Sequence, residues 1–293
     1  MRLAKMKLSW QSMRIILPVA CLLLVLLAAR LLLGRRAIGD YSDPGGPRFE
    51  GSYAGEVGEF DGSLRVVTWN LHHAEKLEQA IQTLEDGVEL RDADILLLQE
   101  VDLAGVETIA QRLQYNYVYY PAFFSRRFQK EFGNAILARW PLSDPDKIVL
   151  PNALPGWLES RNSARATILL AGRGINIYSV HLDYTWMLLK RGESQVEFLA
   201  RAAGGEDNII ILGGDFNTWT SGSIAFLDNL MGKIGLIRLT KGTGYTFEWS
   251  GLKLTLDHIF SKAVLDYQAG VYRQTDASDH YPVWVEISLG INK

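Results

Sequence analysis

Cysteine is nearly absent from this chain of 293 residues: the one cysteine is Cys21, which lies in an apolar run near the N-terminus. One cysteine cannot form a disulfide within the chain, so the fold must be held by its hydrophobic core. With 48% hydrophobic residues, the chain is long enough for one sizeable domain and a small appendage. The cysteine content leaves the redox compartment open.

Basic residues are scarce after residue 38. Residues 1–38 contain seven of the 30 basic residues and no acidic ones, which leaves 23 basic against 33 acidic residues and a formal charge of −10. General nucleic-acid binding relies on clustered Lys and Arg that release counterions. The charge therefore disfavours a general nucleic-acid binder, although metal ions at a site would offset part of it.

The N-terminal segment, residues 1–38, combines basic residues with one long apolar run. Residues 15–33 are apolar except for Arg30, and this run has about the length that spans a bilayer. We expect an uncleaved, single-pass signal anchor, with a cleaved signal peptide at Ala28-Ala29 as the alternative. Cys21 is a poor lipoprotein signal because Pro18-Val19-Ala20 precede it and apolar residues follow it.

The charges beside the apolar run indicate its orientation. Four basic residues precede the run and two follow it, and the more basic flank of a membrane helix usually stays in the cytoplasm. We therefore expect the domain to lie outside the cytoplasm, in the periplasm or outside the cell. Arg35 and Arg36 argue against this orientation.

After residue 38 the chain changes from an irregular segment to a regular pattern. Residues 39–62 are rich in Gly, Pro, Ser and Asp, and we expect a linker there before a domain over residues 63–290. The apolar periodicity predicts strands at residues 64–69, 95–98, 117–120, 134–138, 165–170, 175–180, 209–212, 254–260 and 283–287, and helices at 76–91, 106–113, 193–203 and 223–231.

The expected elements mix strands and helices without strict alternation, and several strands are neighbours in hairpin pairs. The sequence contains no internal repeat. This pattern favours an α+β fold in which stacked sheets carry helices on the outside, rather than one doubly wound sheet.

Polar residues follow or precede the apolar strands at their ends. Such positions let a rigid scaffold bring side chains together at one place. Carboxylate and amide oxygens can hold a divalent cation, and an imidazole can act on a water molecule. The residues at these strand ends are Asn70, Glu100, His181, Asp215 with Asn217, Asp257, and Asp279 with His280.

Each of these residues also has a structural alternative. Asn70 suits a turn, Glu100 suits the cap of the helix that follows it, and Asp215 suits an Asx-turn with Asn217. His181 and His280 suit half-buried positions in which other groups satisfy their nitrogens. We favour a functional site, because the structural alternative would otherwise have to be true at all six strand ends at the same time.

The ordered motifs TWNLH, LLLQE, FGNAILARWP, SVHLD, GGDFN, LDHIF and SDHYPV resemble the endonuclease/exonuclease/phosphatase superfamily, which has the DNase I-like fold. The resemblance covers about residues 64–287, and order and spacing agree throughout. It implies a four-layer α/β/β/α sandwich of two mostly antiparallel sheets with outer helices. It also implies hydrolysis of a phosphate ester with Mg²⁺ or Mn²⁺.

The resemblance assigns a role to each strand-end residue. It implies that Asn70, Glu100 and Asp279 bind the metal ion. Asp215 and Asn217 match the pair that orients the water and contacts the phosphate or a second ion. His280 matches either the catalytic base or the group that stabilises the pentacoordinate phosphorus. Asp257 matches the carboxylate that orients the imidazole of His280. His181 matches a phosphate ligand or general acid. This histidine is typical of the DNase-like and sphingomyelinase-like branches, whereas abasic-site nucleases have Asn at this place, so His181 argues against the abasic-site branch.

Further residues match the family less firmly. Arg161 matches an Arg that contacts phosphate oxygens, with a solvated surface position as the alternative. We place Asn134 near the substrate, more as a structural turn residue than as a ligand. Arg191 and Gln195 suit a helix face packed under the site. We expect no part in the chemistry for His72, His73 and His258.

Residues 115–132 contain eight aromatic residues with Arg126, Arg127 and Lys130 among them. Such a segment suits stacking on single-stranded nucleic acid or a position at a membrane interface. The alternative is that strand aromatics fill the core and a solvated basic loop follows. Trp157, Trp186 and Trp219 suit the lining of a substrate cleft or the cover of a sheet edge.

Three functions are compatible with these features. The first is a membrane-anchored nuclease that hydrolyses a phosphodiester by in-line attack of water. The second is a phospholipid or sphingomyelin phosphodiesterase or phosphatase, which the apolar N-terminal run and the aromatic segment favour. The third is a catalytically silent binding module, which the complete set of site residues disfavours. We expect no obligate protein partner.

Overall fold

The computed structural model describes residues 24–25, 41–57, 60–125, 127–151, 160–184, 194–205 and 208–290. The chain divides into two units at residues 40 and 41, and the expected membrane segment lies almost wholly outside the described residues. Among the residues that are described, no helix is both long enough and apolar enough to span a bilayer.

The larger sheet has the strand order β1-β4-β5-β3-β2-β15-β14. Its neighbours pair in antiparallel fashion except for β2 and β3, which are parallel. The strands are β1 (Phe49–Ser52), β2 (Ser63–Asn70), β3 (Ile95–Val101), β4 (Asn116–Ser125), β5 (Lys130–Ala138), β14 (Val264–Val271) and β15 (Val283–Leu289).

The second sheet has the order β10-β13-β9-β8-β7-β6, and its parallel pair is β8 with β9. A short hairpin of β11 (Phe247–Trp249) and β12 (Leu252–Leu254) stands apart from both sheets. The strands of the second sheet are β6 (Ser143–Val149), β7 (Asn162–Leu170), β8 (Arg173–His181), β9 (Ile209–Asp215), β10 (Ile237–Arg238) and β13 (Asp257–Ser261).

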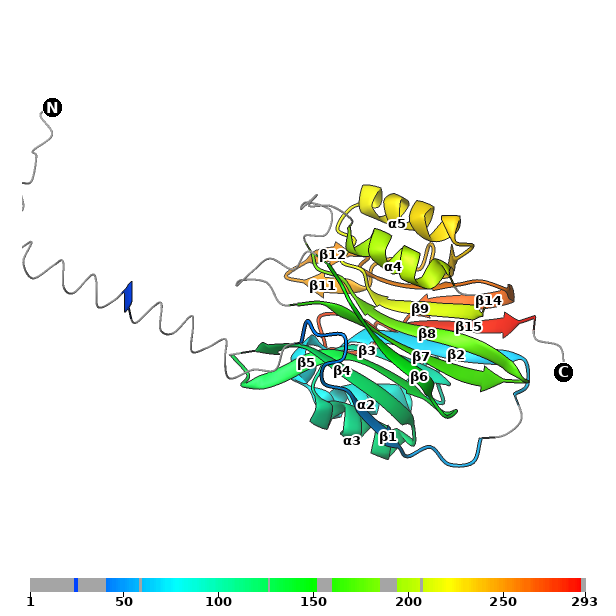
Figure 1. Ribbon diagram of the computed structural model, residues 1–293, viewed down its shortest axis with the longest axis horizontal. Helices are drawn as coiled ribbons and strands as arrows, with labels where there is room; N and C mark the ends of the chain where they lie inside the picture. Colours follow the sequence, from blue (N-terminus) through cyan, green and yellow to red (C-terminus); the bar gives the residue numbers. More distant parts are fainter. Residues whose placement is uncertain are drawn as a thin grey trace, which may run out of the picture. The chain divides into compact units, whose positions relative to one another are not determined.

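Helices cover the outer face of each sheet (Figure 1). Helices α2 (Leu77–Asp86) and α3 (Leu103–Leu113) pack on the larger sheet, and α4 (Gln195–Gly204) and α5 (Ser221–Lys233) pack on the second. A 3₁₀ turn, η1 (His72–Ala74), follows β2. The expected sandwich of sheets with outer helices is confirmed.

The central strands are buried on both faces, which explains why they read as continuous apolar runs. In β2, Leu64 and Val66 point into the core between the sheets, whereas Val67 and Trp69 point toward α2 and α3. The alternation follows from the two-residue period of a strand. The same division holds in β3, where Ile95 and Leu97 face the other sheet.

The two parallel pairs set the position of the site. Because parallel strands end at the same edge of a sheet, Asn70 lies beside Gln99, and His181 lies beside Asp215. Strand β13 runs antiparallel to β9, so its first residue, Asp257, lies opposite Asp215. The ends of both parallel pairs and the start of β13 therefore meet.

The structure corrects the expected boundaries at the edges of the sheets. The expected linker over residues 39–62 is wrong for Phe49–Ser52, which form β1 and pair with β4. The strand expected over residues 254–260 is two strands, β12 and β13. Strands β6, β10, β11 and β14 were not expected, and each is short, polar or exposed, so none forms a continuous apolar run.

Candidate functional site

Glu100 reaches the site because β3 is irregular at that residue. The register of β3 against β5 shifts between Gln99 and Val101, and Glu100 has a φ of 51°. Such a bulge re-aims a side chain. The alternative role as a helix cap is wrong, because Asp102 caps α3 by accepting a hydrogen bond from the Gly105 amide.

The Asn70 side chain links the two halves of the site. Its Nδ2 donates to Glu100 Oε1 at 3.2 Å and to Asp215 Oδ2 at 3.1 Å. Its Oδ1 accepts a hydrogen bond from the His72 backbone amide at 3.0 Å. Because that amide can only donate, it fixes the oxygen away from Glu100, and the structure does not present Asn70 as an oxygen ligand.

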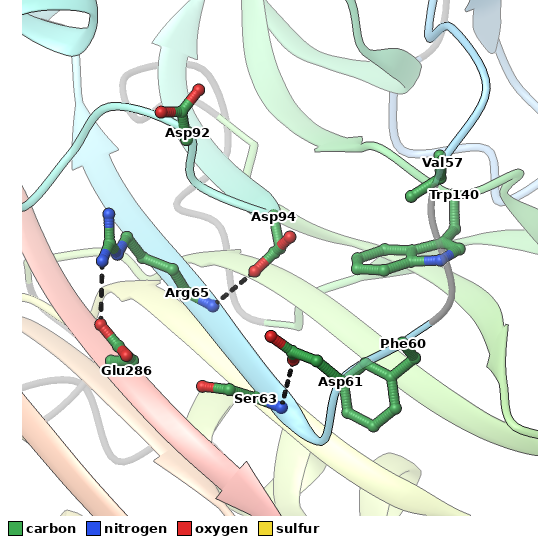
Figure 2. A pocket seen from close by; sticks show the side chains of 9 residues that line it. All are labelled: Val57, Phe60, Asp61, Ser63, Arg65, Asp92, Asp94, Trp140 and Glu286. Atoms are coloured by element: carbon green, nitrogen blue, oxygen red, sulfur yellow. Dashed lines mark hydrogen bonds and ion pairs between the residues drawn. The ribbon is translucent and has the colours of Figure 1, made fainter.

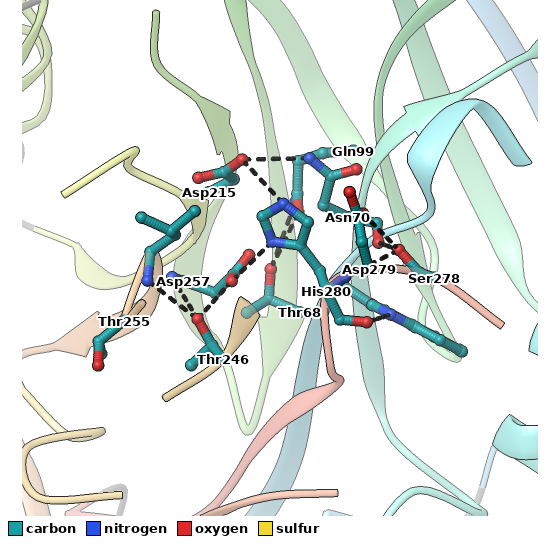
Figure 3. A network of polar contacts seen from close by, with 12 residues as sticks. Thr68, Asn70, Gln99, Asp215, Thr246, Thr255, Asp257, Ser278, Asp279 and His280 are labelled. Carbon is teal, nitrogen blue, oxygen red and sulfur yellow. Dashed lines mark hydrogen bonds and ion pairs between the residues drawn. The ribbon is translucent and has the colours of Figure 1, made fainter. Parts of the chain in front are cut away.

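His280 is held by Asp257 and faces Asp215 (Figure 3). Its Nδ1 lies 2.9 Å from Asp257 Oδ2, and its Nε2 lies 3.8 Å from Asp215 Oδ2. Thr246 Oγ1 donates to the same Asp257 oxygen at 2.6 Å. The carboxylate therefore fixes the tautomer and the orientation of the imidazole.

The protonation of this group decides its chemistry. Burial alone would lower the pKa of His280, but the Asp257 and Asp215 carboxylates raise it to about 10. Burial raises the pKa of Asp215 to about 7, against the opposing effect of His280. Near neutral pH, His280 is an imidazolium that donates a proton, and Asp215 is the group poised to accept one.

His181 lies between the two acidic residues of the site. Its Nε2 is 3.5 Å from Asp215 Oδ2 and 3.8 Å from Glu100 Oε1. Burial, assisted by the charge of Arg161, holds the pKa of His181 well below its usual value. His181 is therefore neutral near pH 7, and two facing carboxylates place its proton on Nε2.

Glu100 stays ionised in this environment. Burial raises its pKa, but His181, His73, Arg161 and His280 together lower it to about 2. Because His181 is itself uncharged near neutral pH, this conclusion rests on the permanent guanidinium of Arg161 and on the imidazolium of His280. Arg161 is 7% exposed, so its alternative position on the solvated surface is wrong.

Asp215 and Asn217 occupy a tight turn at the end of β9. The Asn217 amide donates to Asp215 Oδ1 at 2.9 Å, as in an Asx-turn, while Asp215 Oδ2 faces the histidines. Asn217 Nδ2 donates to the Leu182 carbonyl at 2.9 Å, so Asn217 positions Asp215 in addition to any contact with water. Gly214 has a φ of 152°, and a Cβ there would collide with the Val180 carbonyl.

Asn134 lies in strand β5 rather than in the expected turn. It is 1% exposed, and its Nδ2 donates to Asn162 Oδ1 at 2.8 Å. This bond ties β5 to β7 of the other sheet, beside Gln99 and one residue from Glu100. The structure shows a structural link between the sheets, and the expected substrate contact of Asn134 stays a prediction.

Two histidines that we expected to take no part lie against the acidic residues. His72 Nδ1 is 3.5 Å from Asp279 Oδ1, and His73 Nδ1 is 3.2 Å from Glu100 Oε2. The sequence feature that could have identified both histidines is the motif TWNLHH, in which His72 and His73 follow the same strand end as Asn70. His258 is fully buried and its Nε2 contacts Thr218 Oγ1, as expected of a structural residue.

The aromatic segment mostly fills the core. Its buried members have exposed fractions of 5% or less, whereas Arg127 and Lys130 are exposed, so the core alternative is confirmed for the described residues. Arg126, Trp157, Trp186 and Arg191 lie outside the described residues. Gln195 accepts from the Asp183 amide beneath the site, and the exposed Trp219 donates to Asn217 Oδ1. The buried aromatics are Tyr115, Tyr117, Tyr119, Tyr120, Phe123 and Phe132.

The site has the donors that a divalent cation requires. Ser278 Oγ donates to the Asn70 carbonyl at 2.8 Å, which brings the neighbouring Asp279 to the end of β2. Glu100 and Asp279 supply carboxylate oxygens, which hard cations prefer. Asp215, Asp257 and His280 also lie close enough to share an ion, but the bond between Asp257 and His280 already engages that set.

A cavity of about 350 Å³ lies at the opposite end of β2 (Figure 2). Its charged groups are engaged with one another: the Arg65 guanidinium contacts Glu286 at 2.9 Å, and the Arg65 amide donates to Asp94 at 2.7 Å. The length of β2 separates Ser63, which lines this cavity, from Asn70 by about 23 Å at 3.3 Å per residue. We therefore exclude it as the catalytic site.

Comparisons with known proteins agree with this geometry. The sequence profile described as Endonuclease/Exonuclease/phosphatase family matches residues 67–280. UPF0294 proteins of Vibrio cholerae and Vibrio vulnificus are 26% identical over 238 residues, which cover 80% of this chain and 81% and 80% of theirs.

Solved structures show the same fold. An endonuclease/exonuclease/phosphatase family protein from Leptotrichia buccalis is similar with a TM-score of 0.62 and 19% identity, over 76% of this chain and 99% of that chain. D. rerio TDP2 complexed with a single-strand DNA product is similar with a TM-score of 0.57 and 18% identity, over 78% and 99% of the two chains.

Proposed function

Because the chain belongs to the endonuclease/exonuclease/phosphatase family, whose members hydrolyse phosphoester bonds, we propose that it is a divalent-metal-dependent phosphodiesterase. The observation that supports this most strongly is the group of Asp257, His280 and Asp215, in which one carboxylate orients an imidazole that faces a second carboxylate. A binding module would have no use for this buried and costly arrangement of charges.

In the proposed reaction, water attacks phosphorus in line with the ester oxygen that leaves. Asp215 Oδ2 takes the proton of the attacking water, since the pKa of this carboxyl, about 7, suits a base near neutral pH. His280, as an imidazolium, donates a hydrogen bond from Nε2 to a non-bridging oxygen of the phosphate. This assigns His280 the stabilising role and Asp215 the role of base.

The remaining residues hold the phosphate and the cation. Glu100 and Asp279 would hold a Mg²⁺ or Mn²⁺ ion, which would neutralise the phosphate charge and stabilise the leaving oxygen. Neutral His181 donates a hydrogen bond from Nε2 to the phosphate. The guanidinium of Arg161 adds a fixed positive charge beside Glu100. The P–O ester bond breaks and water supplies the new oxygen on phosphorus.

We favour a nucleic acid as the substrate. The support is the similarity in fold to D. rerio TDP2, whose structure contains a single-strand DNA product. The exposed side chains of Trp219 and Tyr184 near the ends of β9 and β8 offer stacking surfaces for bases. The charge of −10 after residue 38 predicts weak binding away from the metal site.

A phospholipid phosphodiesterase or phosphatase remains the second candidate. It is favoured by the apolar run over residues 15–33, which we propose anchors the protein in a membrane with the domain outside the cytoplasm. An anchor would keep the site near lipid headgroups. Localisation alone, however, does not select a substrate.

The catalytic assignment is tested by Asp215→Ala and His280→Ala with bis-p-nitrophenyl phosphate and Mg²⁺. Each variant should lose at least about a hundredfold in rate while keeping its circular dichroism spectrum. Asp266→Ala, an exposed position in β14, is the matched control and should keep full activity. Unchanged turnover in either site variant would overturn the mechanism.

The substrate is tested with residues 39–293 on plasmid DNA, RNA and phospholipid vesicles side by side. Cleavage of nucleic acid alone would exclude the lipid candidate, and cleavage of lipid alone would exclude the nuclease. The topology is tested with a reporter enzyme fused after Lys293. We expect its activity outside the cytoplasm and none inside. Activity inside would show the opposite orientation.

A further inference from the structure

His73 has a buried ring nitrogen that no hydrogen bond explains. Its Nδ1 atom has no hydrogen-bond partner among the described residues, yet it lies 3.2 Å from Glu100 Oε2. An N–H aimed at that oxygen would form a hydrogen bond at this distance. The Nδ1 and Oε2 atoms are therefore close, but they are not oriented as the donor and acceptor of a hydrogen bond.

The surroundings hold the His73 ring in this position. Phe128 stacks on it at 4.9 Å between ring centroids, and Phe132 meets it edge-on at 4.8 Å. His72, His73 and Ala74 all have positive φ, a conformation that costs free energy in non-glycine residues. Packing and backbone together direct Nδ1 at Glu100.

The neighbouring amide cannot serve the same ion with oxygen. The His72 backbone amide engages Asn70 Oδ1, so Asn70 Nδ2, which is no metal ligand, faces Glu100. The oxygen ligand expected from Asn70 is therefore turned away, and an imidazole nitrogen lies beside the same carboxylate. One oxygen donor is in effect replaced by one nitrogen donor.

We propose that His73 Nδ1 and Glu100 Oε2 bind the same divalent ion, and that this site takes a transition-metal ion in preference to Mg²⁺. Two ligand atoms about 2.1 Å from one ion and at right angles lie about 3 Å apart, close to the observed contact. Imidazole nitrogen binds Zn²⁺, Fe²⁺ and Ni²⁺ most readily, and one such ligand in an oxygen site also favours Mn²⁺ over Mg²⁺, which takes oxygen ligands and water. The proposal rests on the metal site assigned above.

Binding of Mn²⁺ and Mg²⁺, without substrate, tests the proposal. We expect residues 39–293 to bind Mn²⁺ at least about tenfold more tightly than Mg²⁺ by calorimetry. Pulsed electron paramagnetic resonance of the bound Mn²⁺ should show coupling to a directly coordinated imidazole ¹⁴N. Neither measurement depends on hydrolysis.

Two substitutions separate the nitrogen from the packing of the ring. His73→Phe keeps an aromatic ring beside Phe128 and Phe132, and it should abolish the ¹⁴N coupling and weaken Mn²⁺ binding about tenfold. His73→Asn places an amide oxygen near the position of Nδ1. This variant should abolish the ¹⁴N coupling and reduce the preference for Mn²⁺ over Mg²⁺ to about twofold. It therefore tests the nitrogen ligand even if His73→Phe does not fold.

His72→Gln is the matched control, because it alters the adjacent, partly exposed histidine and keeps the backbone amide that engages Asn70. The ¹⁴N coupling should persist in this variant. Coupling that survives in both His73 variants, or that disappears in His72→Gln, would assign the nitrogen to another histidine and overturn the proposal. If the wild-type protein binds neither ion, the metal site of the proposed function fails as well.

Discussion

At the scale of single residues, the site depends on two carboxylates with different tasks. Asp257 is fully buried and bonded to both Thr246 and His280, so it orients the imidazole and stabilises its charge. Asp215 is nearly as buried, but its Oδ2 atom faces His181 and His280 across distances of 3.5 and 3.8 Å. Its environment leaves it able to exchange a proton.

Removal of the Asp257 charge should change the pH dependence of the reaction. The carboxylates raise the pKa of His280 to about 10, and the imidazolium is required, so activity should fall only as pH rises through about 10. In Asp257→Asn the pKa of His280 drops, and the alkaline limb of kcat/KM should move down by at least one pH unit. Rates from pH 5 to 10.5 measure this, with Asp266→Asn as the control. An unmoved alkaline limb would contradict the assignment.

Asp215→Asn should stabilise the metal-free fold while it inactivates the enzyme. The pKa of Asp215 is raised from 3.8 to about 7, so the folded state holds its proton more tightly than the unfolded chain does. The contribution of this group to stability is therefore largest below pH 4 and is lost as pH rises through 7. In EDTA at pH 8, the variant should melt a few degrees higher than wild type, with little difference at pH 4. A lower Tm at pH 8 would show that the charge is stabilising.

The identity of the site residues was predictable because each lies at one end of an apolar strand. Asn70, Glu100 and Asp215 were identified in this way. Their orientation was not predictable, since it depends on partners distant in sequence or on backbone geometry. The His72 amide turns the Asn70 oxygen away, and the bulge in β3 re-aims Glu100.

At the scale of elements, each sheet contributes one parallel pair, and both pairs end at the site. Beneath it, Gln99 Nε2 donates to Ser179 Oγ at 3.0 Å and joins β3 of one sheet to β8 of the other. Buried and satisfied polar contacts of this kind fix the relative position of packed layers. The register of the two sheets thus determines the distance from Glu100 to His181.

Gly214→Ala tests how closely β8 and β9 must approach. A Cβ at Gly214 would collide with the Val180 carbonyl, and the φ of 152° is unfavourable for alanine. A strained position costs about 1–3 kcal/mol, which lowers Tm by about 2–4 °C per kcal/mol in a domain of this size. Gly205→Ala, which has open space and a φ of −82°, should leave Tm within about 1 °C. Equal melting temperatures for the two variants would rule out the close approach.

Central and edge strands were not equally predictable from the sequence. Strands β2, β3, β8 and β9 are covered on both faces and read as apolar runs. Edge strands β1, β6 and β14 have one or both faces toward solvent, and their polar residues hide the strand pattern. The core of the fold could therefore be predicted, and its borders could not.

At the scale of the whole molecule, the folded unit includes the segment expected to be a linker. Phe49 packs its ring on Tyr119, and Tyr41 donates to Glu131, so residues 41–52 cover one edge of the larger sheet. Without them, β4 would present an open edge to solvent.

A shortened protein that begins at Ser63 should therefore be less stable than one that begins at Tyr41. We expect a Tm lower by several degrees and greater aggregation, because the free edge of β4 can pair with another chain. Thermal unfolding and light scattering measure both effects. The protein that begins at Tyr41 should match one that begins at Gly39. Equal stability from Ser63 onward would restore the linker interpretation.

The place of β15 between β2 and β14 has a consequence for biosynthesis. The last strand of the domain pairs with β2, the first strand of the core, and Asp279 and His280 immediately precede it. A chain that emerges from the ribosome N-terminus first cannot complete this sheet until residues 283–289 are available. Asp279 and His280 therefore join the other residues of the proposed site only at the end of synthesis, so the proposed hydrolytic centre is assembled last.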